Sequence, residues 1–179
     1  MLSDGARPFV NENMGLSVVF PQGSRVCMSR SGDAPRGFYA RYGTGATGCP
    51  EGREDSPEAS MGLNSSFNAT FLATPAEVAG SCTPPDEAIL QHFGADGLVF
   101  PGHRSLACQS IGKDGSIDLT VYALAGEWAG DPPEDVPHVV YRATLGTRPG
   151  RLEEDLRMFR TFLGQARIGL FQDRPGLGG

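Results

Sequence analysis

The sequence predicts a single α+β domain in which a helix near the C-terminus covers one face of a central antiparallel sheet. Residues 104–125 contain two runs rich in apolar and β-branched side chains, separated by the segment GKDG at 112–115. Glycine and aspartate tolerate the backbone conformations of a tight reversal, so this pattern is typical of a β-hairpin. Residues 151–166 place apolar side chains at helical spacing, as the stripe Leu152, Leu156, Phe159 and Leu163.

The second strand of this hairpin shows why a covering helix is expected. Along residues 116–123 apolar side chains alternate with polar ones, so one face of the strand is apolar and the other is largely polar. The apolar set is Ile117, Leu119, Val121 and Ala123, and the polar set is Ser116, Asp118, Thr120 and Tyr122. The apolar face needs a partner, and the amphipathic helix at 151–166 supplies one.

The length of 179 residues is a normal size for one domain. We assign residues 1–13 to a loose N-terminal segment, 14–171 to the domain and 172–179 to a flexible tail. A hairpin is expected from strands at 15–20 and 24–29, with further extended segments at 37–42, 61–72 and 139–145 and a glycine-rich loop at 43–60. Two short helices are predicted at 75–80 and 84–93, the first with a capping box formed by Thr74 and Glu77. Asn64 and Asn68 each begin an N-x-S/T sequon, which we discount because it is silent in most bacteria.

Composition argues against several classes of function. The net charge of −6 and pI of about 5.0 give a field that repels phosphate backbones, so no nucleic-acid partner is expected. No apolar run reaches the roughly 18 residues of a membrane-spanning helix, and no integral membrane segment is predicted. Cysteines and histidines lack the close spacings of metal ligands, so neither a metal nor a cofactor is predicted. Arginine greatly outnumbers lysine, which favours a bacterial source.

The four cysteines, Cys27, Cys49, Cys82 and Cys108, are widely spaced and favour two disulfides over buried or free thiols. Three connectivities are possible. We favour Cys27 with Cys49 and Cys82 with Cys108, because each bond then closes a moderate loop within one half of the chain. Disulfides indicate the periplasm or the outside of the cell. Residues 1–10 lack a signal-peptide pattern, so we expect a mature form restarted at Met1.

Two patterns suggest nucleotide binding or catalysis, and both are weak. Gly43-x-Gly45-x-x-Gly48 matches the letters of a dinucleotide fingerprint, but no helical pattern follows it, so we interpret it as a glycine loop. His103 and Ser105 could approach each other on one face of a strand as the base and nucleophile of a hydrolase. No G-x-S-x-G elbow or orienting acid accompanies them, and no catalytic residue is predicted.

The segment at residues 126–137 (GEWAGDPPEDVP) is the one we single out for binding. It is acidic, stiffened by prolines, and carries the single tryptophan of the chain. Tryptophan is enriched among interface hot spots, and acidic flanks can steer a basic partner. The alternatives are that the indole packs back on the core and that the acids form a solvated loop. The predicted partner-binding residues are Trp128, Glu127, Asp131, Glu134 and Asp135.

The two ends of the chain resemble PsbP-like α/β domains. The opening GLSVVFPQGSRV (15–26) is similar to the apolar strand and proline turn that begin those domains. The closing strand VVYRATLG (139–146) and the last helix RLEEDLRMFRTFLGQARI (151–168) are similar to their ends. The resemblance implies a helix packed on an antiparallel sheet and a binding or accessory role, and it transfers no catalytic residues.

These observations favour a non-enzymatic binding protein of a bacterial periplasm or the extracellular space. The leading hypothesis is an inhibitor or immunity protein that neutralises a secreted toxin or cell-wall enzyme. The alternatives are a lipoprotein-like accessory or structural subunit of an envelope complex and a hydrolase that uses His103 and Ser105.

Overall fold

The computed structural model describes residues 8–31, 34–42, 49, 59–126 and 137–170. Its strands are β1 (Phe9–Asn11), β2 (Leu16–Val18), β3 (Arg25–Ser31), β4 (Ala34–Tyr42), β5 (Ala59–Phe67), β6 (Ser105–Ile111), β7 (Ile117–Ala125) and β8 (Val139–Thr147). The α-helices are α1 (Pro75–Ala79), α2 (Glu87–Leu90) and α3 (Leu152–Gln165), and the short 3-10 helices are η1 (Glu12–Met14), η2 (Gln91–Asp96) and η3 (Pro149–Arg151).

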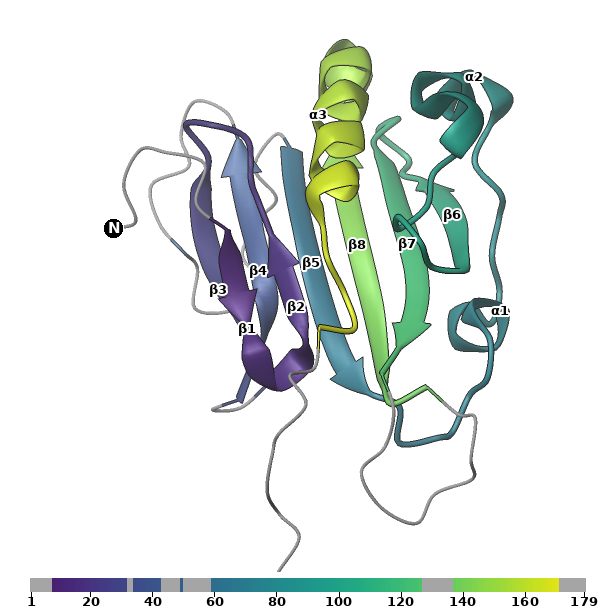
Figure 1. Cartoon of the computed structure of the whole chain (residues 1–179). Coiled ribbons are helices and arrows are strands. Elements are labelled where there is room, and N and C mark those ends of the chain that lie inside the picture. The colour runs from purple at the N-terminus through teal and green to yellow at the C-terminus, as the bar shows by residue number, and fades with distance from the viewer. Residues whose placement is uncertain (1–7, 32–33, 43–48, 50–58, 127–136, 171–179) are drawn as a thin grey trace, which may run out of the picture.

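Six strands form one antiparallel sheet in the order β3-β4-β5-β8-β7-β6 (Figure 1). Strand β8 is therefore inserted between β5 and β7, although it follows both in the sequence. The remaining strands, β1 and β2, form a separate two-stranded antiparallel sheet. This arrangement confirms the predicted α+β class and the predicted β6-β7 hairpin.

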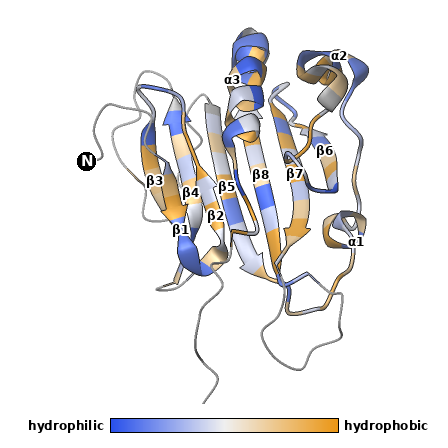
Figure 2. Cartoon of the chain, viewed as in Figure 1, coloured by the Kyte–Doolittle hydropathy of each residue, from blue (hydrophilic) through white to orange (hydrophobic). Residues whose placement is uncertain are grey.

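One face of the large sheet forms the core with α3 and the β1-β2 pair. Leu63, Ala143 and Val121 share one cross-strand row of β5, β8 and β7 and are fully buried. They face the apolar stripe of α3, whose Leu156 and Phe159 are also fully buried. The larger of these side chains, such as Leu63, Leu156 and Phe159, each contribute roughly 1.5–3 kcal/mol by leaving water. Figure 2 shows how hydrophobic and hydrophilic residues follow one another along the strands, as a sheet with one dry face requires.

Tyr141 of β8 forms hydrogen bonds with segments near both ends of the described chain. Its hydroxyl donates to the carbonyl oxygen of Met14 (2.6 Å) and accepts from the backbone N–H of Gly169 (3.2 Å). Ser17 and Arg167 exchange two backbone hydrogen bonds of 2.8 Å beside it. The tyrosine is fully buried, and this burial raises the pKa of Tyr141 to about 12.

The opposite face of the sheet, which we call the polar face, carries hydroxyl, amide and guanidinium groups. The polar side chains named below are exposed or half-buried, and they alternate along each strand with those of the core. They are Arg25 on β3, Tyr39 and Arg41 on β4, Ser60, Asn64 and Ser66 on β5, Arg142 and Thr144 on β8, and Asp118, Thr120 and Tyr122 on β7.

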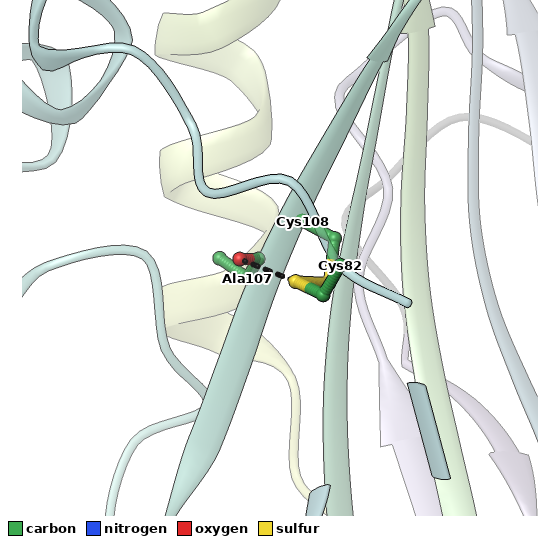
Figure 3. The surroundings of a disulfide bond; sticks show 3 residues. All are labelled: Cys82, Ala107 and Cys108. Carbon is green, nitrogen blue, oxygen red and sulfur yellow. Dashed lines mark hydrogen bonds between the residues drawn. A yellow bond between two sulfur atoms is a disulfide. The ribbon is translucent and has the colours of Figure 1, made fainter. Parts of the chain in front are cut away.

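Both disulfides have the predicted pairing. Cys27 of β3 is bonded to Cys49, and Cys82 is bonded to Cys108 of β6. In the second bond the Cys82 sulfur also lies 3.5 Å from the carbonyl oxygen of Ala107 (Figure 3). Two disulfides are typical of a protein that folds in the periplasm or outside the cell. No helix in the described ranges is both long and apolar enough to cross a membrane.

The N-terminal part of the fold differs from the expected one. The predicted hairpin of residues 15–20 and 24–29 is wrong, because β2 pairs with β1 and not with β3. Strand β1 also lies within the segment 1–13 that we expected to be loose. Aromatic packing explains this order, since the Phe9 ring lies 5.7 Å from that of Phe20 and 5.5 Å from that of Phe38.

Candidate functional site: an aromatic corner at one end of the sheet

The five residues that the sequence indicated for partner binding lie outside the described residues, in the segment 127–136. The structure does describe both ends of this segment, where β7 stops and β8 begins. The backbone N–H of His138 donates to the carbonyl oxygen of Gly126 over 3.0 Å. Gly126 and His138, which flank the segment, are therefore adjacent to each other, and the residues around this pair lie next to both ends of the segment.

Asn68 connects this point to the chain that leaves β5. Its backbone N–H donates to the carbonyl oxygen of His138 (2.9 Å), and its Nδ2 donates to the carbonyl oxygens of Pro137 and Leu72 (2.8 Å each). Its Oδ1 accepts from the N–H of Leu72 (3.0 Å). The side chain is only 1% exposed, so this asparagine is part of the buried frame, and its Nδ2 is already engaged in two hydrogen bonds.

Exposed aromatic rings flank Asn68 on both sides. Phe67 is 46% exposed and Phe71 is 48% exposed, which is unusual for phenylalanine. The ring of His138 stacks on that of Phe67 at 5.5 Å, and the guanidinium of Arg36 lies 4.9 Å from the Phe67 ring centre. We call Phe67, Phe71, His138 and Arg36 the aromatic corner.

Phe71 has a backbone conformation that phenylalanine rarely adopts. Its φ is +55°, the single positive value among the described residues that are not glycine. The left-handed region costs an L-residue roughly 1–2 kcal/mol. The turn is held by a hydrogen bond from the Phe71 N–H to the carbonyl oxygen of Asn68 (3.1 Å) and by the side chain of Asn68. Backbone strain of this kind is concentrated at functional sites.

The corner has the chemistry of a binding surface. It offers two half-exposed rings, a cation and an imidazole, with a buried frame beneath them that fixes their positions. Aromatic side chains and arginine are the groups that interfaces favour at their centres. In the part of the chain that the structure describes, no three side chains of the His, Cys, Asp or Glu type are grouped as a metal would require.

The hydrolase pair does not have the geometry that its chemistry needs. Strand β6 begins only at Ser105, so His103 lies in the preceding turn, where its N–H donates to the carbonyl oxygen of Phe100 (3.1 Å). The Ser105 hydroxyl accepts from the N–H of Phe100 (3.0 Å) and donates to the backbone carbonyl of His103 (3.1 Å). The hydroxyl therefore stabilises a turn, and its proton faces a carbonyl rather than an imidazole. The glycine motif at 43–48 lies outside the described residues.

Comparisons with known proteins give little beyond the fold. No protein-family model matches this chain, and no curated protein matches it. Among solved structures it is similar to the solution structure of cyanobacterial PsbP (CyanoP) from Synechocystis sp. PCC 6803, at 12% identity over 90% of this chain and 91% of that chain, with a TM-score of 0.39. This weak and partial likeness agrees with the PsbP-like pattern at the two ends of the sequence.

Proposed function

We propose that this protein is a non-enzymatic binding domain that captures a protein partner through the aromatic corner and the adjoining segment 127–136. The observation that supports the proposal is the pair of half-exposed phenylalanines, one of them strained, at the base of the segment that carries Trp128. The segment that the sequence indicates for binding therefore begins and ends beside residues of this corner.

The energetics suit an interface. Burying the exposed half of each ring would contribute roughly 1 kcal/mol, and Trp128 adds a large, rigid side chain of the kind that dominates hot spots. The hydrogen bonds of Asn68 hold the corner in place before binding, which lowers the entropy lost on association. The partner would therefore meet a largely preformed apolar centre.

The charges around this centre indicate the partner's chemistry. The segment contributes Glu127, Asp131, Glu134 and Asp135, so an apolar patch with a basic rim would fit it best. Together with an oxidising compartment, this favours an inhibitor or immunity protein that neutralises a basic secreted toxin or cell-wall enzyme.

Site-specific crosslinking tests the proposal. A photoreactive phenylalanine analogue is placed at position 71, or as a control at the exposed Thr161 of α3, and the oxidised protein is incubated with the envelope and secreted fractions of the source organism. We expect one stoichiometric, basic partner to crosslink from position 71 and not from 161, and to be lost when Trp128 and its acidic neighbours are changed to alanine. Equal crosslinking from both positions, or capture that survives those alanines, would refute the proposed site.

A further inference from the structure

The two edges of the six-stranded sheet differ in how they discourage pairing with another chain. The sheet ends at β3 on one side and at β6 on the other (Figure 1). Strand β3 carries Arg25 and Arg30, and its register shifts between Ser29 and Arg30 as at a β-bulge. Charges and bulges both hinder edge-to-edge pairing. Strand β6 has the sequence SLACQSI, which contains no charged residue, proline or glycine. Strands of this kind pair readily with other chains, so β6 needs a different protection.

The segment 82–86, which precedes α2 and which we call the strap, lies along the outer edge of β6. The backbone N–H of Gln109 donates to the carbonyl oxygen of Thr83 over 2.7 Å, and therefore points away from β7. The side-chain Oε1 of Gln109 accepts from the N–H of Asp86 over 2.9 Å. The strap thus occupies a backbone donor that a further strand would use.

A disulfide fixes the beginning of the strap to the strand that it covers. Cys82 is bonded to Cys108 in the middle of β6, and its sulfur lies 3.5 Å from the carbonyl oxygen of Ala107 (Figure 3). The strap continues with Pro84 and Pro85, which have no N–H group to offer. It therefore covers the edge without providing a new row of donors for another strand.

The strand beneath the strap is suited to antiparallel pairing with its own counterpart in a second copy of the chain. Ala107 and Gln109 have the same orientation in β6, so their backbone groups point outward together. A two-fold axis at Cys108 would pair Ala107 of each copy with Gln109 of the other. No charges would meet along this edge, whereas self-pairing of β3 would place arginines from both copies beside one another.

We propose that β6 is a latent association edge, which the strap blocks while the Cys82–Cys108 bond is closed and which pairs with β6 of a second copy while that bond is open. A dithiol opens the bond, because its two thiols form a disulfide as Cys82 and Cys108 each receive a hydrogen. The strap is then held to β6 without a covalent link. The same open state precedes formation of the bond during folding. The proposal does not depend on the aromatic corner or on its partner.

Cysteine crosslinking of the full-length protein tests this pairing, with the Cys27–Cys49 bond left intact. In Cys82→Ser a free Cys108 remains in β6, and the two copies of it would lie opposite each other at a non-hydrogen-bonded position. The Cα atoms at such a position are about 4.5 Å apart, within the range of about 4.4–6.8 Å that a disulfide spans. Diamide then accepts the two thiol hydrogens. Cys108→Ser, which frees Cys82 on the strap, is the matched control, and we expect at least about fivefold more disulfide-linked dimer from Cys82→Ser.

Ala107→Pro separates edge pairing from chance collision of thiols. It removes an N–H that points outward and keeps the ladder between β6 and β7, so adding it to Cys82→Ser should reduce the dimer to the level of Cys108→Ser. The unmodified protein treated with a dithiol should gain a dimer in sedimentation that the oxidised protein lacks. Equal crosslinking of the two single-cysteine variants, a dimer that survives Ala107→Pro, or no dimer at all would overturn the proposal. Loss of the near-ultraviolet circular dichroism on reduction would also overturn it, because the bond would then hold the whole domain and not the strap.

Discussion

Removing the Tyr141 hydroxyl should destabilise the protein. It should also abolish the part of the loss of stability at alkaline pH that comes from this phenol. In Tyr141→Phe the buried carbonyl oxygen of Met14 and the N–H of Gly169 both lose their partner. An unsatisfied buried group costs about 1–3 kcal/mol, so we expect a loss of about 3 kcal/mol at pH 7. For a chain of this size that corresponds to a fall of about 6–12 °C in the melting temperature.

The pH dependence follows from the pKa of Tyr141, which the fold raises from 10.0 to about 12. Between these values the unfolded chain has released the phenolic proton and the native protein still holds it. The free energy of unfolding of the native protein therefore falls as the pH rises, by about 1.4 kcal/mol per pH unit and about 3 kcal/mol over the window. The stabilising effect of the raised pKa is complete below pH 10. In Tyr141→Phe this phenol is absent, so its contribution to the fall of the unfolding free energy with pH is absent too.

Reversible urea denaturation at pH 7, 10 and 11 measures both effects. The difference between the native protein and Tyr141→Phe should be largest at pH 7 and should shrink above pH 10. Tyr39→Phe on the polar face is the matched control, and we expect it to change stability by less than about 0.5 kcal/mol. Parallel loss of stability in the native protein and the Tyr141 variant above pH 10 would show that the hydroxyl is not the group responsible.

Three further substitutions test a buried carboxylate, the second disulfide and the cap of α1. The fully buried carboxylate of Asp155 accepts from the Thr147 hydroxyl at 2.5 Å, so Asp155→Asn should lower the free energy of unfolding by about 2–4 kcal/mol, and a loss below 1 kcal/mol would contradict this. Replacing both Cys82 and Cys108 with serine opens a loop of 26 residues and should cost about 3 kcal/mol in urea titration; an unchanged midpoint would mean that the reduced chain stays ordered there. Thr74→Ala removes the capping box of α1 and should cost about 1 kcal/mol, seen as faster amide exchange in α1 but not in α3.

Much of the sheet and of its covering helix could be predicted from the sequence because several local signals agree in these elements. The alternation along residues 116–123, the glycine turn before it and the stripe of α3 all indicate the same apolar interface, and the structure buries it. The capping box at Thr74 and the spacing of the cysteines were equally local, and both predictions are confirmed. The partner of β2 was not predictable in this way, since it depends on Phe9 packing against Phe20 and Phe38 across the fold.

The candidate site was missed because its determinants are not contiguous. Phe67 and Phe71 look like the end of an apolar alternation, and Asn68 between them looks like a sequon. Only the fold shows that Asn68 binds the carbonyl of Pro137 and thereby joins this turn to the base of the segment 127–136. The one available signal was an asparagine placed where the strand pattern should have continued with a small or apolar residue.

The proposed binding surface has a physical property that separates it from the core. Core positions such as Leu63 and Phe159 satisfy propensity, burial and packing at once. Phe71 instead holds a left-handed backbone conformation with a half-exposed ring. This arrangement does not improve the stability of the isolated domain, and glycine at position 71 would remove the conflict. Proteins violate local rules chiefly where function requires it. The turn at which this chain departs from its own best local structure is therefore a place where binding is expected.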